Sequence, residues 1–159
     1  MAIAYFSTWT TFGTWLPGDK RGWFQRDQGI QQPEPTRVLA ANLIMNADAF
    51  TLDHEQRCIV TETVIAHCEI RNWHLHAVNC RSNHVHVVVT APNRLIEIPR
   101  EQLKSWCTRN LREAERLRGI ADSAVRRPWW TERGWDLFVD DEKHLEEVIS
   151  YVLEGQDHR

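Results

Sequence analysis

The stretch "NWHLHAVNCRSNHVHVVV", residues 72–89, contains two β-type segments separated by a short polar link. β-Branched and apolar residues are frequent in both segments, and the link "CRSN" is short enough for a tight turn. Two such segments joined in this way predict a β-hairpin. The second segment ends in an apolar run, which is typical of a central strand buried on both faces. We therefore expect "WHLHAVN" and "HVHVVVTA" to pair, with the second strand inside a sheet.

The residues before the hairpin predict one strand and two helices. Residues 2–12 are rich in β-branched and aromatic types and are typical of a first strand. A long connection with several prolines and glycines follows, and residues 37–45 are compatible with a short helix. The helix before the hairpin is better defined, because Asp53 and Gln56 have the spacing of a capping box ahead of a periodic apolar segment.

The residues after the hairpin predict a helix, a strand and a second helix. Residues 100–118 carry an apolar stripe at helical spacing, which we expect to be buried. The stripe consists of Leu103, Trp106, Cys107, Leu111, Ala114 and Leu117. Residues 128–141 are typical of a strand with a turn near Arg133, and residues 141–155 of a last helix that Gly155 ends.

The order of these elements predicts the fold class. Consecutive strands usually pair, and crossover connections are right-handed. The order strand, helix, strand, strand, helix, strand, helix therefore indicates an α+β fold of the ferredoxin-like type. It comprises a four-stranded antiparallel sheet with helices on one face, plus a C-terminal helix. The length suits a single domain over residues 1–159.

Composition narrows the class of protein. No apolar run is long enough to cross a bilayer, so we expect a cytoplasmic protein with no membrane partner. The four cysteines form no C-x-x-C pair, which favours free and mostly buried thiols over a zinc ribbon or a disulfide framework. The formal net charge is −3, yet residues 104–133 contain eight basic side chains against four acidic ones. This segment can attract an anionic partner that the whole chain does not.

Several of these basic residues gather on one side of a predicted element. On a helix over residues 100–118, Arg109, Arg112 and Arg116 fall opposite the apolar stripe, where they face either a phosphate backbone or solvent. The candidate contacts to phosphate are Lys104, Arg109, Arg112, Arg116, Arg126 and Arg127.

The hairpin also contains two His-x-His pairs. Residues two apart in a strand point to the same face, so each pair can present two imidazoles side by side. His84 and His86 begin the predicted central strand, where little entropy is lost in holding a site, and we assign a metal to them. We interpret His74 and His76 as structural or peripheral. Tyr151 falls at the edge of the apolar stripe of the last helix, as a border aromatic residue or with its hydroxyl directed outward.

Four blocks of the sequence resemble one known family. "RSNHVHVVV" is similar to the histidine-hydrophobic-histidine strand of the single-tyrosine HUH transposases, which include the REP-associated tyrosine transposases. "TFGTWLPGDKRGW", "LKSWCTRNL" and "WWTERGWDLFVDDEKHLEEVISYV" resemble other blocks of that family in the expected order, and together the blocks span nearly the whole chain.

The resemblance implies a function. Family members cut and rejoin single-stranded DNA, recognise DNA hairpins, and hold Mg²⁺ or Mn²⁺ on the HUH histidines. Carried over, His84 and His86 bind the metal, and Tyr151 is the nucleophile that forms a 5′-phosphotyrosine link. The alternative is a hairpin-binding regulator that does not cleave. A homodimer that exchanges the tyrosine helix is also open.

The resemblance implies two further sets of residues. Relatives place an amide ligand four residues after the tyrosine, where this chain has Gly155, so the third metal ligand is Gln156 or, in competition, Glu154. The tryptophans in loop-like or basic surroundings are candidates for stacking on unpaired bases, and we expect no more than half of them to contact DNA. These are Trp15, Trp23, Trp129 and Trp130.

Overall fold

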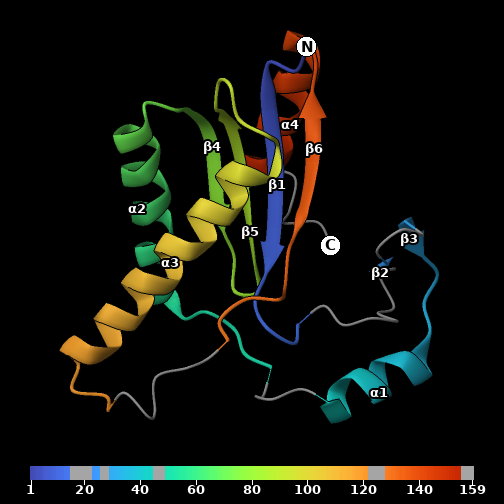
Figure 1. The fold of residues 1–159 in the computed structure, drawn as a ribbon, viewed down its shortest axis with the longest axis vertical. Helices are drawn as coiled ribbons and strands as arrows, with labels where there is room; N and C mark the ends of the chain where they lie inside the picture. Colours follow the sequence, from blue (N-terminus) through green and yellow to red (C-terminus); the bar gives the residue numbers. More distant parts are fainter. Residues whose placement is uncertain (15–22, 26–28, 45–48, 122–127, 155–159) are drawn as a thin grey trace.

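A four-stranded antiparallel sheet runs through the centre of the molecule in the order β4-β5-β1-β6 (Figure 1). The strands are β1 (Ala4–Thr10), β4 (His74–Cys80), β5 (His84–Thr90) and β6 (Trp135–Val139). The computed structural model describes residues 1–14, 23–25, 29–44, 49–121 and 128–154. The predicted sheet and the hairpin of β4 and β5 are confirmed, and β5 is an inner strand as expected.

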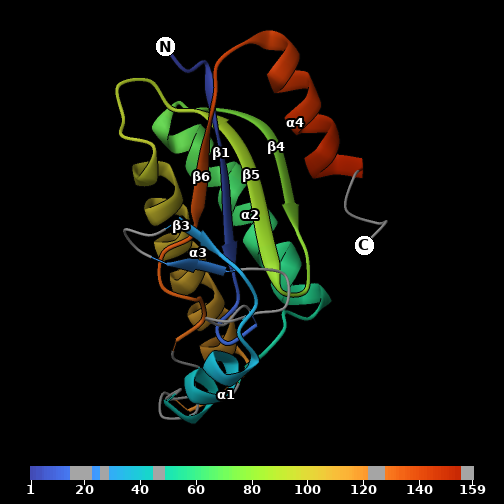
Figure 2. The same ribbon diagram turned by 90° about the vertical axis from the view of Figure 1, so that its right-hand side faces the viewer.

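Helices cover both faces of this sheet. α2 (His54–Arg71) and α3 (Glu97–Leu117) lie side by side on one face, whereas α4 (Glu142–Glu154) lies on the other (Figures 1 and 2). β5 supplies both cores because its side chains alternate. Val85, Val87 and Val89 belong to the core under α2 and α3, and Val88 belongs to the core under α4. The apolar run of β5 thus has the two-sided burial that its sequence predicts.

Local sequence signals define α2 at both ends. The predicted capping box is present, since the Asp53 side chain accepts from the Gln56 backbone N–H and the Gln56 side chain accepts from that of Asp53. At the other end Asn72 has a left-handed conformation with φ of 58°, which a short polar side chain tolerates. The chain then turns directly into β4.

Two features differ from the sequence-based expectation. Two short strands, β2 (Trp23–Gln25) and β3 (Gly29–Gln31), form a separate two-stranded sheet that is too short to leave a pattern in the sequence. The turn predicted near Arg133 is present, with a φ of 66° at that residue, but β6 covers only part of the strand predicted over 128–141, and Trp130 before the turn forms an isolated bridge to Thr11. The short helix predicted over residues 37–45 is present as α1 (Pro35–Ile44), which lies at the end of the molecule away from α4 (Figure 2).

The cysteines form no disulfide bond. All four cysteines are free, and Cys68 and Cys107 are buried. Burial raises the pKa of the Cys68 thiol to about 11, so this side chain behaves as a small apolar core residue. Within the described part of the chain, no helix has the length and apolar character that crossing a bilayer requires.

Candidate metal and nucleophile site

His84 and His86 lie side by side at the start of β5. Their ring centroids are 4.6 Å apart, with an angle of 65° between the ring planes. Both precede Val88 by an even number of residues, so they share its face of the sheet, on the side of α4. The sequence predicted this pairing from the strand period alone.

An oxygen atom holds each of the two rings through Nδ1. His84 Nδ1 lies 2.7 Å from Asn83 Oδ1, and His86 Nδ1 lies 2.6 Å from Thr8 Oγ1. When a histidine donates from Nδ1, its Nε2 lone pair is the one available to a metal ion, and such outer partners fix the orientation of metal-binding histidines. Asn83 and Thr8 were not identified from the sequence, although Asn83 directly precedes His84.

His86 is neutral at ordinary pH. Its side chain is buried, and the loss of solvation, helped by His84 and Arg81, lowers its pKa from 6.5 to about 3. Because a proton and a metal ion compete for the same lone pair, a neutral ring is ready to bind a cation.

Tyr151 projects from α4 toward this pair of histidines. The centroid of its ring lies 5.8 Å from that of His86 and 6.1 Å from that of Phe6. The side chain is 38% exposed, so it lies at the edge of the buried stripe of α4, as its helical position predicted. Asn79 Nδ2 donates to the carbonyl oxygen of Val152 at 2.8 Å, which ties α4 to β4 one residue from Tyr151.

The described residues supply part of a ligand set for a divalent ion. They contain no group of three His, Cys, Asp or Glu side chains placed to hold a metal, and the choice between Gln156 and Glu154 as third ligand stays a prediction. Gln156 lies outside the described residues. Mg²⁺ and Mn²⁺ favour oxygen ligands, and Mg²⁺ commonly keeps water and substrate phosphate in its coordination shell. Two imidazoles would thus supply only a minor part of the coordination of such an ion, and oxygen atoms would have to supply the rest.

The second pair of histidines lies at the other end of the same face. His74 and His76 have ring centroids 4.4 Å apart, and His76 Nε2 lies 2.8 Å from Thr90 Oγ1. Burial, with a smaller contribution from His74, lowers the pKa of His76, and Glu142 at the start of α4 partly opposes this. About 13 Å of helix separates Glu142 from Tyr151. The structure therefore brings Tyr151 to His84 and His86, and it keeps the other pair apart.

Lys104 differs from the other predicted phosphate contacts. Its side chain is buried, and its ammonium group donates to the backbone carbonyl oxygens of Thr131, at 3.1 Å, and Arg133. Burial also lowers the pKa of Lys104. The side chain thus joins α3 to the segment before β6 instead of facing solvent, and we leave it out of the proposed DNA surface.

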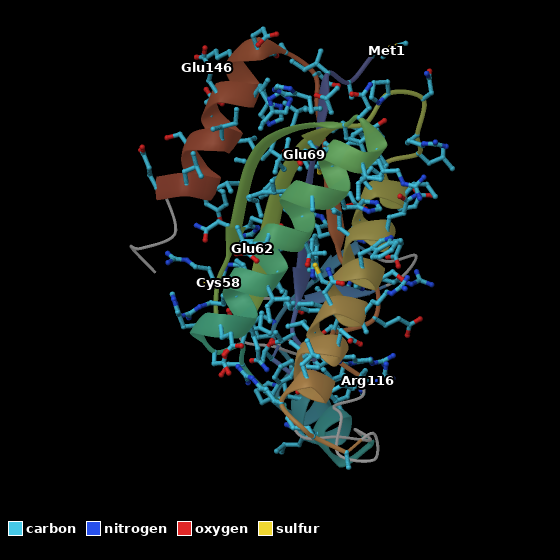
Figure 3. The ribbon with its side chains drawn as sticks, turned by 90° about the vertical axis from the view of Figure 1, so that its left-hand side faces the viewer. Met1, Cys58, Glu62, Glu69, Arg116 and Glu146 are labelled. Carbon is cyan, nitrogen blue, oxygen red and sulfur yellow. The ribbon has the colours of Figure 1, made fainter. Side chains whose placement is uncertain are left out.

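Three predicted arginines share a groove on α3. Arg109, Arg112 and Arg116 line it with Ser105, Trp106 and Thr108, and its volume is about 550 Å³. The Arg109 guanidinium lies 4.8 Å from the centre of the Trp106 ring, a cation–π contact. Since α3 and α4 cover opposite faces of the sheet, this groove does not adjoin Tyr151. Figure 3 shows Arg116 near one end of the molecule and Glu146 of α4 near the other. Arg126 and Arg127 lie outside the described residues.

The comparison with known proteins rests on the fold. No protein-family model and no curated protein sequence matches the chain. Among solved structures, one match is a REP-associated tyrosine transposase bound to a REP hairpin, with 12% sequence identity and a TM-score of 0.51. This chain has the fold of that transposase. The match covers 96% of this chain and 66% of the transposase chain, so the present chain spans about two thirds of that protein's length.

The tryptophans are distributed differently from the prediction. Trp129 and Trp130 are 2% and 7% exposed, so both belong to the core in place of stacking on bases. Trp15 and the side chain of Trp23 lie outside the described residues. Trp106, expected to be buried, is 39% exposed, because it lies at the margin of the stripe next to Arg109. The most exposed described tryptophan is Trp135 on β6, at 47%.

Proposed function

We propose that the protein binds DNA hairpins and cleaves and rejoins single-stranded DNA through Tyr151, with Mg²⁺ or Mn²⁺ bound at His84 and His86. The observation that supports this most directly is the 5.8 Å separation of the Tyr151 and His86 rings within one chain. The shared fold with a transposase bound to a REP hairpin supports hairpin DNA as the ligand.

The chemistry follows from the properties of a phenol. With a usual pKa near 10, only about 0.1% of such a group is ionised at neutral pH, so attack on phosphate needs assistance. A divalent ion at His84 and His86 would neutralise charge on the scissile phosphate and orient it. Tyr151 Oη then attacks the phosphorus, and the bond from phosphorus to the 3′-oxygen breaks. The phenol loses its proton and the departing 3′-oxygen gains one, directly or through water, so that a free 3′-hydroxyl is released.

The products explain why rejoining needs no nucleotide triphosphate. One phosphodiester bond is exchanged for another, since the 5′-phosphate is now esterified to Tyr151. A 3′-hydroxyl can attack this phosphotyrosine link and restore the strand, releasing Tyr151 as the free phenol.

The arginine groove on α3 fits a second part of this function. Arg109, Arg112 and Arg116 offer positive charge in one groove, which suits the phosphate backbone of a duplex stem. Because the groove and Tyr151 lie on opposite faces of the sheet, we assign the groove to hairpin binding and the histidine face to cleavage.

A non-cleaving hairpin-binding regulator is the second candidate. It is favoured by the absence, among the described residues, of a third His, Cys, Asp or Glu side chain placed to bind a metal with His84 and His86. Such a protein would use the α3 groove in the same way and would form no covalent product.

A covalent-adduct measurement separates the two candidates. The protein is incubated with single strands from the DNA flanking its gene, with Mn²⁺ or with chelator, and its intact mass is measured under denaturing conditions. Cleavage adds the mass of an oligonucleotide at Tyr151, and both Tyr151→Phe and His84→Ala abolish it. Tight hairpin binding without any adduct on either strand would reject cleavage and leave the regulator.

A further inference from the structure

A row of side chains crosses the sheet at the level of His86. Thr8 of β1 pairs with His86 of β5 on one side and with Trp135 of β6 on the other. Directly opposed residues of neighbouring strands point to the same face. His86, Thr8 and Trp135 therefore point to the face of the sheet that also carries Tyr151.

Phe6 connects these rings into one aromatic surface. Its centroid lies 5.3 Å from His86, 6.1 Å from Tyr151 and 6.4 Å from Trp135. Phe6 itself is 6% exposed, whereas Tyr151 and Trp135 are 38% and 47% exposed. The two exposed rings thus stand on either side of a buried one, next to the histidine that would hold the metal.

Trp135 contacts the core through its edge-to-face pair with Phe6, and nearly half of its surface is exposed. α4 packs mainly over β4 and β5, whereas Trp135 lies on β6, the edge strand at the other side of the sheet. Large aromatic side chains dominate the energetics of cores and interfaces, so an exposed tryptophan beside a reactive site indicates a surface that binds something flat and apolar.

We propose that Trp135 is the platform on which an unpaired nucleobase of the single strand stacks, next to the phosphate held at His84 and His86. This inference rests on the proposed function, since it names how that site holds its substrate. β5 and β6 are about 10 Å apart in the sheet, so the base belongs to a nucleotide close to the scissile phosphate. A duplex hides its base faces, whereas every unpaired base offers a face to an aromatic ring.

A matched pair of substitutions tests the platform. Trp135→Ala removes the ring on the histidine face, and Phe138→Ala removes a ring that is 53% exposed on the same strand but on the opposite face, against Tyr5. The probe is oligodeoxythymidylate, and its affinity is measured by fluorescence anisotropy in chelator. We expect Trp135→Ala to weaken binding about tenfold, Trp135→Phe to retain most of the affinity, and Phe138→Ala to bind as the unchanged protein does.

A second probe shows whether the partner of Trp135 is a base. In a set of oligonucleotides with one abasic position each, one position should weaken binding to the unchanged protein about as much as Trp135→Ala does. With that oligonucleotide, Trp135→Ala should cause no further loss. Equal affinities of Trp135→Ala and the unchanged protein, or losses that simply add, would overturn the platform.

The adduct measurement distinguishes failure of the base platform from failure of the proposed cleavage function. If the unchanged protein forms the adduct and Trp135→Ala forms it at the same strand concentration, the cleavage function stands and the platform is rejected. If no adduct forms but Trp135→Ala and the abasic position lose affinity together, cleavage fails and the base platform stands.

Discussion

Thr8 Oγ1 and His86 Nδ1 lie 2.6 Å apart across the β1 and β5 pair. This contact is partly buried and orients the ring on which the proposed metal site depends. We expect Thr8→Val, which keeps the shape but removes the hydroxyl, to lower Mn²⁺ affinity by about 10- to 100-fold. Isothermal titration calorimetry measures this decrease, with Thr8→Ser as the control that restores the hydroxyl.

The comparison of Thr8→Val with Thr8→Ser tests whether the Thr8 hydroxyl orients the His86 ring. Thr8→Val and Thr8→Ser should both retain the far-ultraviolet circular dichroism of the unchanged protein. If Thr8→Val bound Mn²⁺ as tightly as Thr8→Ser, the hydroxyl would have no part in positioning His86.

The placement of Tyr151 against His86 within one chain predicts how mixed variants behave. Tyr151→Phe lacks the proposed nucleophile, and His84→Ala lacks a proposed metal ligand. We expect a mixture of the two chains to form no DNA adduct, because every chain then carries an incomplete site. Recovery of the adduct in the mixture would show that two copies exchange the tyrosine helix and share their sites.

The groove on α3 predicts a salt-dependent contribution to hairpin binding. Replacing Arg109, Arg112 or Arg116 by Gln should reduce the slope of log affinity against log salt by about one for each phosphate that the variant no longer neutralises. Arg71→Gln is the control, because Arg71 is an exposed residue at the end of α2 and does not line the groove. Hairpin titrations at several salt concentrations measure the slopes, and equal slopes for the groove and control variants would exclude this surface.

The buried imidazole of His86 predicts a loss of stability in acid. Its folded pKa of about 3 lies below the unfolded value of 6.5, so between these values the unfolded chain binds the extra proton. The free energy of unfolding therefore falls as pH falls through this window, by about 2 kcal/mol from His86 between pH 7 and pH 5. Urea denaturation in chelator at both pH values measures it.

His86→Gln isolates this effect from the other titrating groups. Glutamine does not titrate, so the variant should lose less stability than the unchanged protein between the two pH values. An equal loss in both proteins would show that His86 takes up its proton at an ordinary pH in the folded state.

Much of the fold could be predicted because its signals are local. The apolar run of β5 requires burial on both sides, and the Asp53 and Gln56 spacing begins α2 where the structure has it. Helical spacing alone placed Tyr151 at the edge of a buried stripe. Short elements such as β2 and β3 escaped prediction, because three residues are too few to show a period.

Parts of the site could not be predicted, because they depend on residues far apart in the chain. Lys104 looks like a surface cation in the sequence, yet carbonyl groups from the segment before β6 bind it in the core. Trp129 and Trp130 look like loop residues, yet they complete the core under α2 and α3. Trp135 stands out only once strand pairing places it level with His86.

The sequence by itself determined which residues share a face of each element, since that depends only on the period of a strand or a helix. It placed His84 beside His86, and His74 beside His76, without distinguishing the neighbours of the two pairs. Only the tertiary structure decided that α4 packs on the sheet face opposite α2 and α3, with Tyr151 against His86. The physical reason is that β5 has apolar side chains on both faces, so its sequence does not specify which helix packs on which face. Packing between elements far apart in the chain decides this, and with it which helix lies over His84 and His86.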